Sequence, residues 1–239
     1  MTSRNRAGRR PSGRILVLPL ALTLAACGNN PEKAQGWRGF AEAVNAERNS
    51  RQSKQRVADS AGAADQQATI RKALAANKGP MMLAVMETTQ RPAVIGAFGR
   101  NGPYVTYRTA SQQTLTFRDG VLTGTRGLGY ELLSSEADGS IALIGGRREG
   151  TAQRVYWHLS GENHSVPTRM TCEISRAGND PVVLADGRSV PTTRMTESCR
   201  ADDLKIRNSY WVSDAGTVLQ SIQWVSPEVG KIAFQTLRP

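Results

Sequence analysis

The stretch TLTFRDGVLTGT, residues 114–125, decides the fold class. Its first half alternates threonine with large apolar residues, and its centre is Asp119-Gly120. An Asp-Gly pair tolerates the positive φ angles of a two-residue hairpin turn. Alternation of apolar and polar residues is typical of a strand with one buried face. The stretch therefore predicts a β-hairpin.

The expected register of this hairpin gathers its apolar side chains on one face. Pairing Arg118 with Val121 places Phe117 opposite Leu122. Leu115 shares the face of Phe117, because side chains two residues apart along a strand point the same way. The intervening threonines and Arg118 point to the other face. We expect one face in a core and one in water.

Similar short runs of β-branched and aromatic residues, separated by turn residues, continue to the end of the chain. A second hairpin is expected around Asp214-Ala215-Gly216, and residues 226–230 turn into a last strand. Further strands are expected near residues 82–87, 92–98, 103–108, 140–145, 153–159 and 167–175. Roughly ten strands predict one all-β domain over residues 80–239, an antiparallel barrel-like or sandwich fold.

Residues 1–26 have the layout of a lipoprotein signal peptide. Five arginines and no acidic residue precede an apolar run over residues 15–26. As a helix this run reaches about 18 Å, too short for a hydrocarbon core of about 30 Å. It ends in LAACG, residues 24–28, which resembles a bacterial lipobox. We expect Cys27 to carry diacylglycerol and palmitate and to become the mature N-terminus; an ordinary signal peptide is the alternative.

Gly28 follows the cysteine, where an aspartate would favour retention at the inner membrane, so we expect an outer-membrane lipoprotein facing the periplasm. Residues 27–60 are predicted to be the lipidated N-terminus and a flexible tether, with one short amphipathic helix near Trp37. A second helix is expected over residues 61–79, where Gly79-Pro80 would end it.

Export to an oxidising compartment predicts a disulfide between Cys172 and Cys199. On the chain-entropy model this bond stabilises the fold by about 3.5 kcal/mol. The alternative is a catalytic thiol, which needs a neighbouring base, and the only histidines are His158 and His164.

The formal net charge of +11 includes the five arginines of the leader, so the mature chain is near +6. Its positive charges are scattered among acids, and we expect no nucleic-acid partner. A basic surface suits anionic lipid headgroups and acidic polysaccharide equally well.

Motifs for cofactors and metals are weak. The glycine-rich stretch 124–129 lacks the order of a dinucleotide fingerprint and the lysine of a P-loop, so we expect no cofactor. Two interpretations of this stretch remain. Gly127 permits the backbone angles of a tight turn, or the turn presents Arg126 to an anionic ligand. His158, Glu162 and His164 fit no zinc spacing, and no metal site is expected.

Two further site hypotheses concern sugars. Carboxylates for glycoside cleavage have no distinguishing context, and no catalytic residue is predicted among Glu131, Glu173, Glu197 and Glu228. Aromatic faces stack on sugar rings, and a glutamine side chain forms hydrogen bonds with sugar hydroxyls. The candidate sugar contacts are therefore Tyr210, Trp211, Gln223 and Trp224. Alternatively these aromatic residues fill the core. Tyr210 and Trp211 are adjacent in a strand and must face opposite ways.

Two blocks resemble the YjbF (GfcB-like, group 4 capsule) family of bacterial lipoproteins. They are LTFRDGVLTGTRGLGYELLSS, residues 115–135, and NSYWVSDAGTVLQSIQWVSPEVGKI, residues 208–232. The likeness covers residues 78–238, with the cysteine pair and the lipobox in matching places. It implies an all-β, barrel-like domain and a role in export of extracellular polysaccharide, and it brings no catalytic residue. Relatives are expected to carry a basic residue at position 222, which is Ile222 here.

We therefore expect a non-catalytic lipoprotein that assists secretion or assembly of exopolysaccharide or capsule. It would dock to an export protein or to the polymer. The alternatives are a carbohydrate-active enzyme of the cell envelope and a structural envelope lipoprotein. The residues expected to make the contacts are Arg126, Gly127, Tyr210, Trp211, Gln223 and Trp224.

Overall fold

The computed structural model describes residues 58–160, 162 and 164–239. The expected signal peptide, the lipidation site Cys27 and nearly all of the expected tether lie outside the described residues. The described part begins with helix α2, Ala58–Ala76, where a helix was expected over residues 61–79. Neither described helix is both long and apolar enough to cross a membrane.

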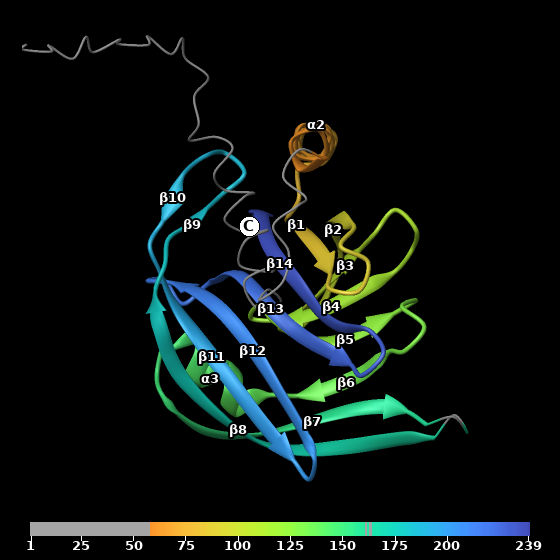
Figure 1. Cartoon of the computed structure of the whole chain (residues 1–239), viewed down its shortest axis with the longest axis vertical. Helices are drawn as coiled ribbons and strands as arrows, with labels where there is room; N and C mark the ends of the chain where they lie inside the picture. Colours follow the sequence, from red (N-terminus) through yellow and green to blue (C-terminus); the bar gives the residue numbers. More distant parts are fainter. Residues whose placement is uncertain (1–57, 161, 163) are drawn as a thin grey trace, which may run out of the picture. The chain divides into compact units, whose positions relative to one another are not determined.

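The fold is all-β, as the sequence predicts. One antiparallel sheet of 12 strands has the order β5-β4-β3-β2-β1-β14-β13-β12-β11-β8-β7-β6. It curls into a nearly closed barrel, in which β5 and β6 lie side by side (Figure 1). Its strands are β1 Met81–Met86, β2 Pro92–Asn101, β3 Tyr104–Arg108, β4 Thr114–Arg118, β5 Val121–Arg126, β6 Leu132–Glu136, β7 Gly150–Leu159, β8 Ser165–Asn179, β11 Thr192–Ala201, β12 Leu204–Ser213, β13 Val218–Ser226 and β14 Gly230–Arg238.

The β4–β5 hairpin has the predicted turn. Asp119 and Gly120 have φ angles of 49° and 81°, and Phe117 pairs with Leu122. A Cβ on Gly120 would lie 2.4 Å from the Cβ of Val218, so glycine is required for close packing as well as for its φ angle. A bulge then shifts the register, and Thr116 pairs with Gly124.

Apolar side chains form two cores, one on each side of the sheet. The interior core includes both apolar residues of β4, Leu115 and Phe117. A second core lies on the outer face of β1, β12, β13 and β14, under the small β9–β10 hairpin, Val182–Val183 and Ser189–Val190. Its buried members are Leu83, Val85, Val182, Trp211, Leu219, Ile222 and Ala233. These central strands are therefore covered on both faces.

The strand expected at residues 140–145 is wrong, because these residues lie in helix α3, Asp138–Gly145. A short apolar run has no period that separates strand from helix. Here Ser140, Ile141 and Ile144 are buried together, which is the i, i+1, i+4 spacing of one helix face. Three elements were also missed, namely β6, β11 and the β9–β10 hairpin.

Candidate functional site

An ion pair lies at the centre of the barrel interior. Arg154 on β7 donates from Nη1 to Oε2 of Glu197 on β11 at 2.6 Å, and their side chains are 1% and 0% exposed. Tyr210 Oη and Asn208 Nδ2, both on β12, donate to the same oxygen at 3.0 and 2.8 Å. Three neighbouring donors therefore hold one buried carboxylate.

Arg154 also joins the two edge strands of the sheet from the inside. Its Nη2 donates to the carbonyl oxygen of Leu122 on β5 at 3.1 Å, and its Nε donates to Ser135 Oγ on β6 at 3.2 Å. Its guanidinium carbon lies 4.5 Å from the centre of the Tyr156 ring. This one side chain thus links the barrel seam to the central carboxylate.

The interior fixes the protonation state of these groups. Burial raises the pKa of Glu197, but the combined effect of Arg154 and the neighbouring donors is opposite and larger. The pKa of Glu197 is therefore below its ordinary value. Burial opposes the charge of Arg154, yet Glu197 raises the pKa of the guanidinium overall. Burial is also the main cause of the raised pKa values of Tyr156 and Tyr210. Glu197 is ionised at neutral pH and holds no proton that a general acid would donate.

Gln223 anchors the β4–β5 turn from the interior. Its Oε1 accepts from Leu122 N at 2.8 Å, and its Nε2 donates to the carbonyl oxygen of Gly120 at 2.9 Å. Trp224 packs edge-on against Tyr156, and its backbone N–H donates to Asn208 Oδ1 at 2.8 Å.

The structure buries four of the six residues expected to contact a partner. Tyr210, Gln223 and Trp224 lie in the interior, and Trp211 is in the second core, so Tyr210 and Trp211 do face opposite ways. Their expected role as surface contacts is corrected, because these side chains are 0–8% exposed and a polymer cannot stack on them.

Arg126 and Gly127 lie at the seam between β5 and β6, where no backbone ladder joins the strands. Arg126 Nη1 donates to the carbonyl oxygens of Leu132 and Leu133, both at 3.3 Å. Gly127 has a φ angle of 81°, and its N–H donates to Glu131 Oε1. Arg126 therefore joins the edges from outside as Arg154 does from inside.

A groove of about 460 Å³ runs along the outside of this seam. Most of its lining side chains carry hydroxyls, and its charged residues are Arg126 and Glu136. The side chain of Arg126 is 55% exposed, so it remains accessible from this groove.

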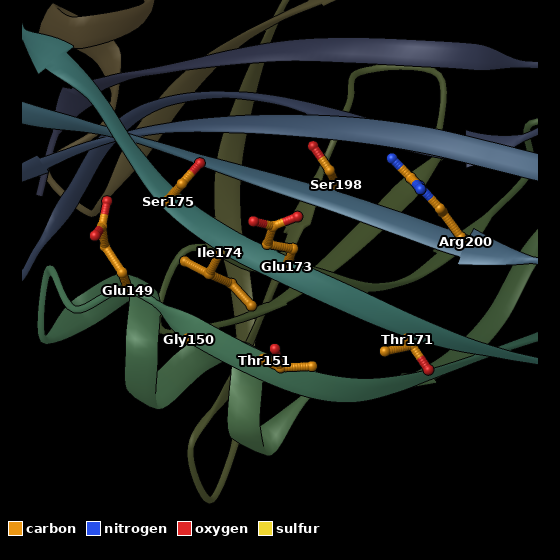
Figure 2. A pocket seen from close by; sticks show the side chains of 9 residues that line it. All are labelled: Glu149, Gly150, Thr151, Thr171, Glu173, Ile174, Ser175, Ser198 and Arg200. Atoms are coloured by element: carbon orange, nitrogen blue, oxygen red, sulfur yellow. The ribbon is translucent and has the colours of Figure 1, made fainter.

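A pocket of about 490 Å³ lies on the outer face of β7, β8 and β11, and Figure 2 shows its lining side chains. The charged ones are Glu149, Glu173 and Arg200, and most of the others are threonine or serine. Glu149 Oε1 accepts from the backbone N–H of Arg176 at 2.9 Å. Both carboxylates are exposed to water.

The expected disulfide between Cys172 and Cys199 is present, and it lies beside Glu197. Its sulfurs are bonded to each other and leave no thiolate for a metal. His158 Nε2 is 2.7 Å from the carbonyl oxygen of Val225. His164 is exposed in the loop between β7 and β8, close to Glu162.

The family comparison agrees with this geometry. A family model described as group 4 capsule polysaccharide lipoprotein gfcB, YjbF, matches residues 40–237. The chain belongs to the YjbF family. Members of this family are lipoproteins associated with capsule polysaccharide, and the match includes the seam, the interior ion pair and the outer pocket. No functionally curated protein matches the chain.

Two solved structures are similar to this one. The hypothetical lipoprotein YmcC from Escherichia coli (K12) matches with a TM-score of 0.63 at 20% identity, over 79% of this chain and 98% of YmcC. This likeness supports the fold. A putative exported protein with a YmcC-like fold from Bacteroides fragilis NCTC 9343 matches with a TM-score of 0.30 at 9% identity, over 66% of this chain and 93% of that protein.

Proposed function

We propose that this protein is anchored through Cys27 to the outer membrane and acts in the periplasm as a non-catalytic accessory in secretion or assembly of a capsule or exopolysaccharide. The observation that carries the proposal is the family match over residues 40–237. Two features typical of exported proteins support it. A lipobox-like stretch lies at residues 24–28, and the domain that follows contains a disulfide.

The proposed mechanism is docking through the outer faces of the barrel. The interior carboxylate is held by three donors and is sealed from water, so it does not offer a reactive group to a substrate. Accessible polar residues line two outer concavities, the seam groove with Arg126 and the pocket with Glu173 and Arg200. These surfaces suit contact with an export protein or with the polymer.

Deletion of the gene in its native host tests the proposal. We expect the deletion strain to secrete less polysaccharide or polysaccharide of altered length, and the wild-type gene to restore both. Normal polymer in the deletion strain would refute the proposed role.

A second experiment tests the anchor. Replacement Cys27→Ser removes the thiol that would be acylated, so the protein is expected to leave the membrane fraction and to complement the deletion poorly. If this variant stays in the membrane fraction and supports secretion fully, the lipid does not position the domain.

A further inference from the structure

The outer face of β8, β11 and β12 carries four cations that form no ion pair among the described residues, although Glu173 lies on the same face and Asp202 and Asp203 follow Arg200 in the β11–β12 turn. Arg169, Arg200, Lys205 and Arg207 point outward from these strands and are exposed; we call them the cationic face. Among the described residues none of the four forms an ion pair or a side-chain hydrogen bond. By contrast, Arg118, Arg147 and Arg188 at the surface each pair with an aspartate.

The strand register brings three of these charges together. Arg200 is directly opposite Lys205, and Arg207 is opposite Ser198, two residues from Arg200 on the same face. Neighbouring strands are about 4.8 Å apart, and like charges directly opposite each other destabilise a sheet. A bound anion would relieve this repulsion.

The cationic face adjoins the outer pocket. Arg200 belongs to both, and Figure 2 shows it on the same side of the sheet as the hydroxyls of Ser198 and Thr171. Thr171 pairs with Arg200 on β11, and Glu173 pairs with Ser198. Donors for carboxylates therefore border hydroxyl and carboxylate groups that form hydrogen bonds with sugar hydroxyls.

We propose that the cationic face and the outer pocket together bind a polysaccharide chain that carries carboxylates. The inference rests on the proposed function and names its ligand. The cations would bind the carboxylates of the chain, and the hydroxyls of Thr171, Ser175 and Ser198 with Glu173 would bind its neutral sugars.

A membrane surface fits this site less well. A bilayer is flat, whereas the pocket is a concavity of about 490 Å³, which an extended chain can enter beside the cations. Glu149 and Glu173 lie in the pocket and would repel phosphate headgroups. A polymer with neutral sugars between its carboxylates avoids this repulsion.

A binding titration tests the ligand class. The full chain, in neutral detergent micelles, is titrated with polygalacturonate fragments by calorimetry. The face variant carries Arg200→Gln, Lys205→Gln and Arg207→Gln. The control variant carries Arg71→Gln, Lys72→Gln and Lys78→Gln, which removes the same charge from exposed positions in and after α2. Urea unfolding of each variant confirms that it is folded.

We expect the face variant to bind at least about tenfold more weakly than the wild type, and the control to stay within about twofold. Raising the salt concentration should weaken binding of the wild type, because salt screens exposed charges. Absence of binding by the wild type, equal binding of neutral dextran, or an equal loss in the control would overturn the proposal. Competition by phosphatidylglycerol added to the micelles would also overturn it, because the face would then recognise a lipid headgroup.

Complementation separates this inference from the proposed function. In the deletion strain we expect the control variant to restore polysaccharide secretion and the face variant to restore it poorly. If the deletion strain shows a defect and the face variant restores secretion fully, this inference fails and the proposed function stands. If the deletion strain shows no defect, the proposed function fails, and the titration alone decides whether the face binds the glycan.

Discussion

Strand β11 carries charge on both of its faces, and the two faces treat it in opposite ways. Its inward residue Glu197 is fully buried and lies 2.6 Å from Arg154. Three residues further along, its outward residue Arg200 is exposed, faces Lys205, and has no acidic partner among the described residues. The interior thus pairs unlike charges, whereas this end of the outer face places two like charges opposite each other.

The difference shows how position in a strand separates stability from binding. A charge buried in the barrel costs several kcal/mol unless it is paired and hydrogen-bonded, so loss of one partner leaves the other uncompensated. An exposed charge keeps its water, and its removal changes the free energy of unfolding little. We therefore expect substitutions of inward residues to change stability and those of outward residues to change ligand affinity.

The largest effect is expected from breaking the interior pair. Arg154→Met or Glu197→Gln should lower the free energy of unfolding by about 3–5 kcal/mol, because each leaves a buried group without its ionic partner. The double variant Arg154→Met with Glu197→Leu should cost less than the sum of the single variants. Urea denaturation followed by tryptophan fluorescence measures all three. Single losses below about 1 kcal/mol would show that the pair is not structural.

The interior also predicts the pH range of stability. The pKa of Glu197 is lowered on folding, so its contribution is present above its unfolded value of about 4.3 and is lost as the pH falls further. The pKa values of Tyr156 and Tyr210 are raised, so the unfolded chain releases their protons first and stability falls above about pH 10.

Unfolding midpoints measured from pH 3 to pH 11 would test this range. Tyr156→Phe should flatten the alkaline limb, because phenylalanine has no proton to lose. The face variant should keep both limbs, because its three substitutions lie outside the interior. An unchanged alkaline limb in Tyr156→Phe would contradict the burial of that phenol as the cause.

Local turn chemistry made the barrel predictable. Asp119-Gly120 specified a hairpin and the pairing next to its turn, because the two positive φ angles depend only on the residues in the turn; the bulge beyond Phe117 was not predicted. The interior ion pair depended on long-range pairing instead. Arg154 and Glu197 are 43 residues apart and meet only because β8 lies between β7 and β11. No local pattern contains that strand order.

A sequence signal for this pair nevertheless existed. Strand β11 was missed because Glu197 occupies an inward position between Met195 and Cys199, and a charge there hides the apolar alternation. The expected disulfide fixes Cys172 opposite Cys199, which would have placed Glu197 in the interior two residues away. A glutamate at a buried position requires a cation, and Arg154 is the inward-facing arginine of β7.

A smaller effect is expected at the seam, which both faces of the sheet support. Arg126→Ala removes hydrogen bonds to the carbonyl oxygens of Leu132 and Leu133 at a partly exposed site, so we expect a loss of about 1 kcal/mol. Amide exchange of β6 should become faster. Arg100→Ala on β2, another exposed arginine, serves as the control. If β6 exchanges at the same rate in both variants, Arg126 does not close the seam, and its exposed side chain is free for a ligand.

The smallest effect on stability is expected on the cationic face. Lys205→Gln should leave the free energy of unfolding within about 0.5 kcal/mol, and it should raise it slightly, because Arg200 then loses the like charge opposite it. A double-mutant cycle with Arg200→Gln measures the repulsion at low salt, and high salt should reduce the coupling. Repulsion means that the folded domain keeps these two charges together at a cost to its stability, as expected if a ligand uses them. A coupling of zero at low salt would remove the electrostatic reason for expecting an anion at this face.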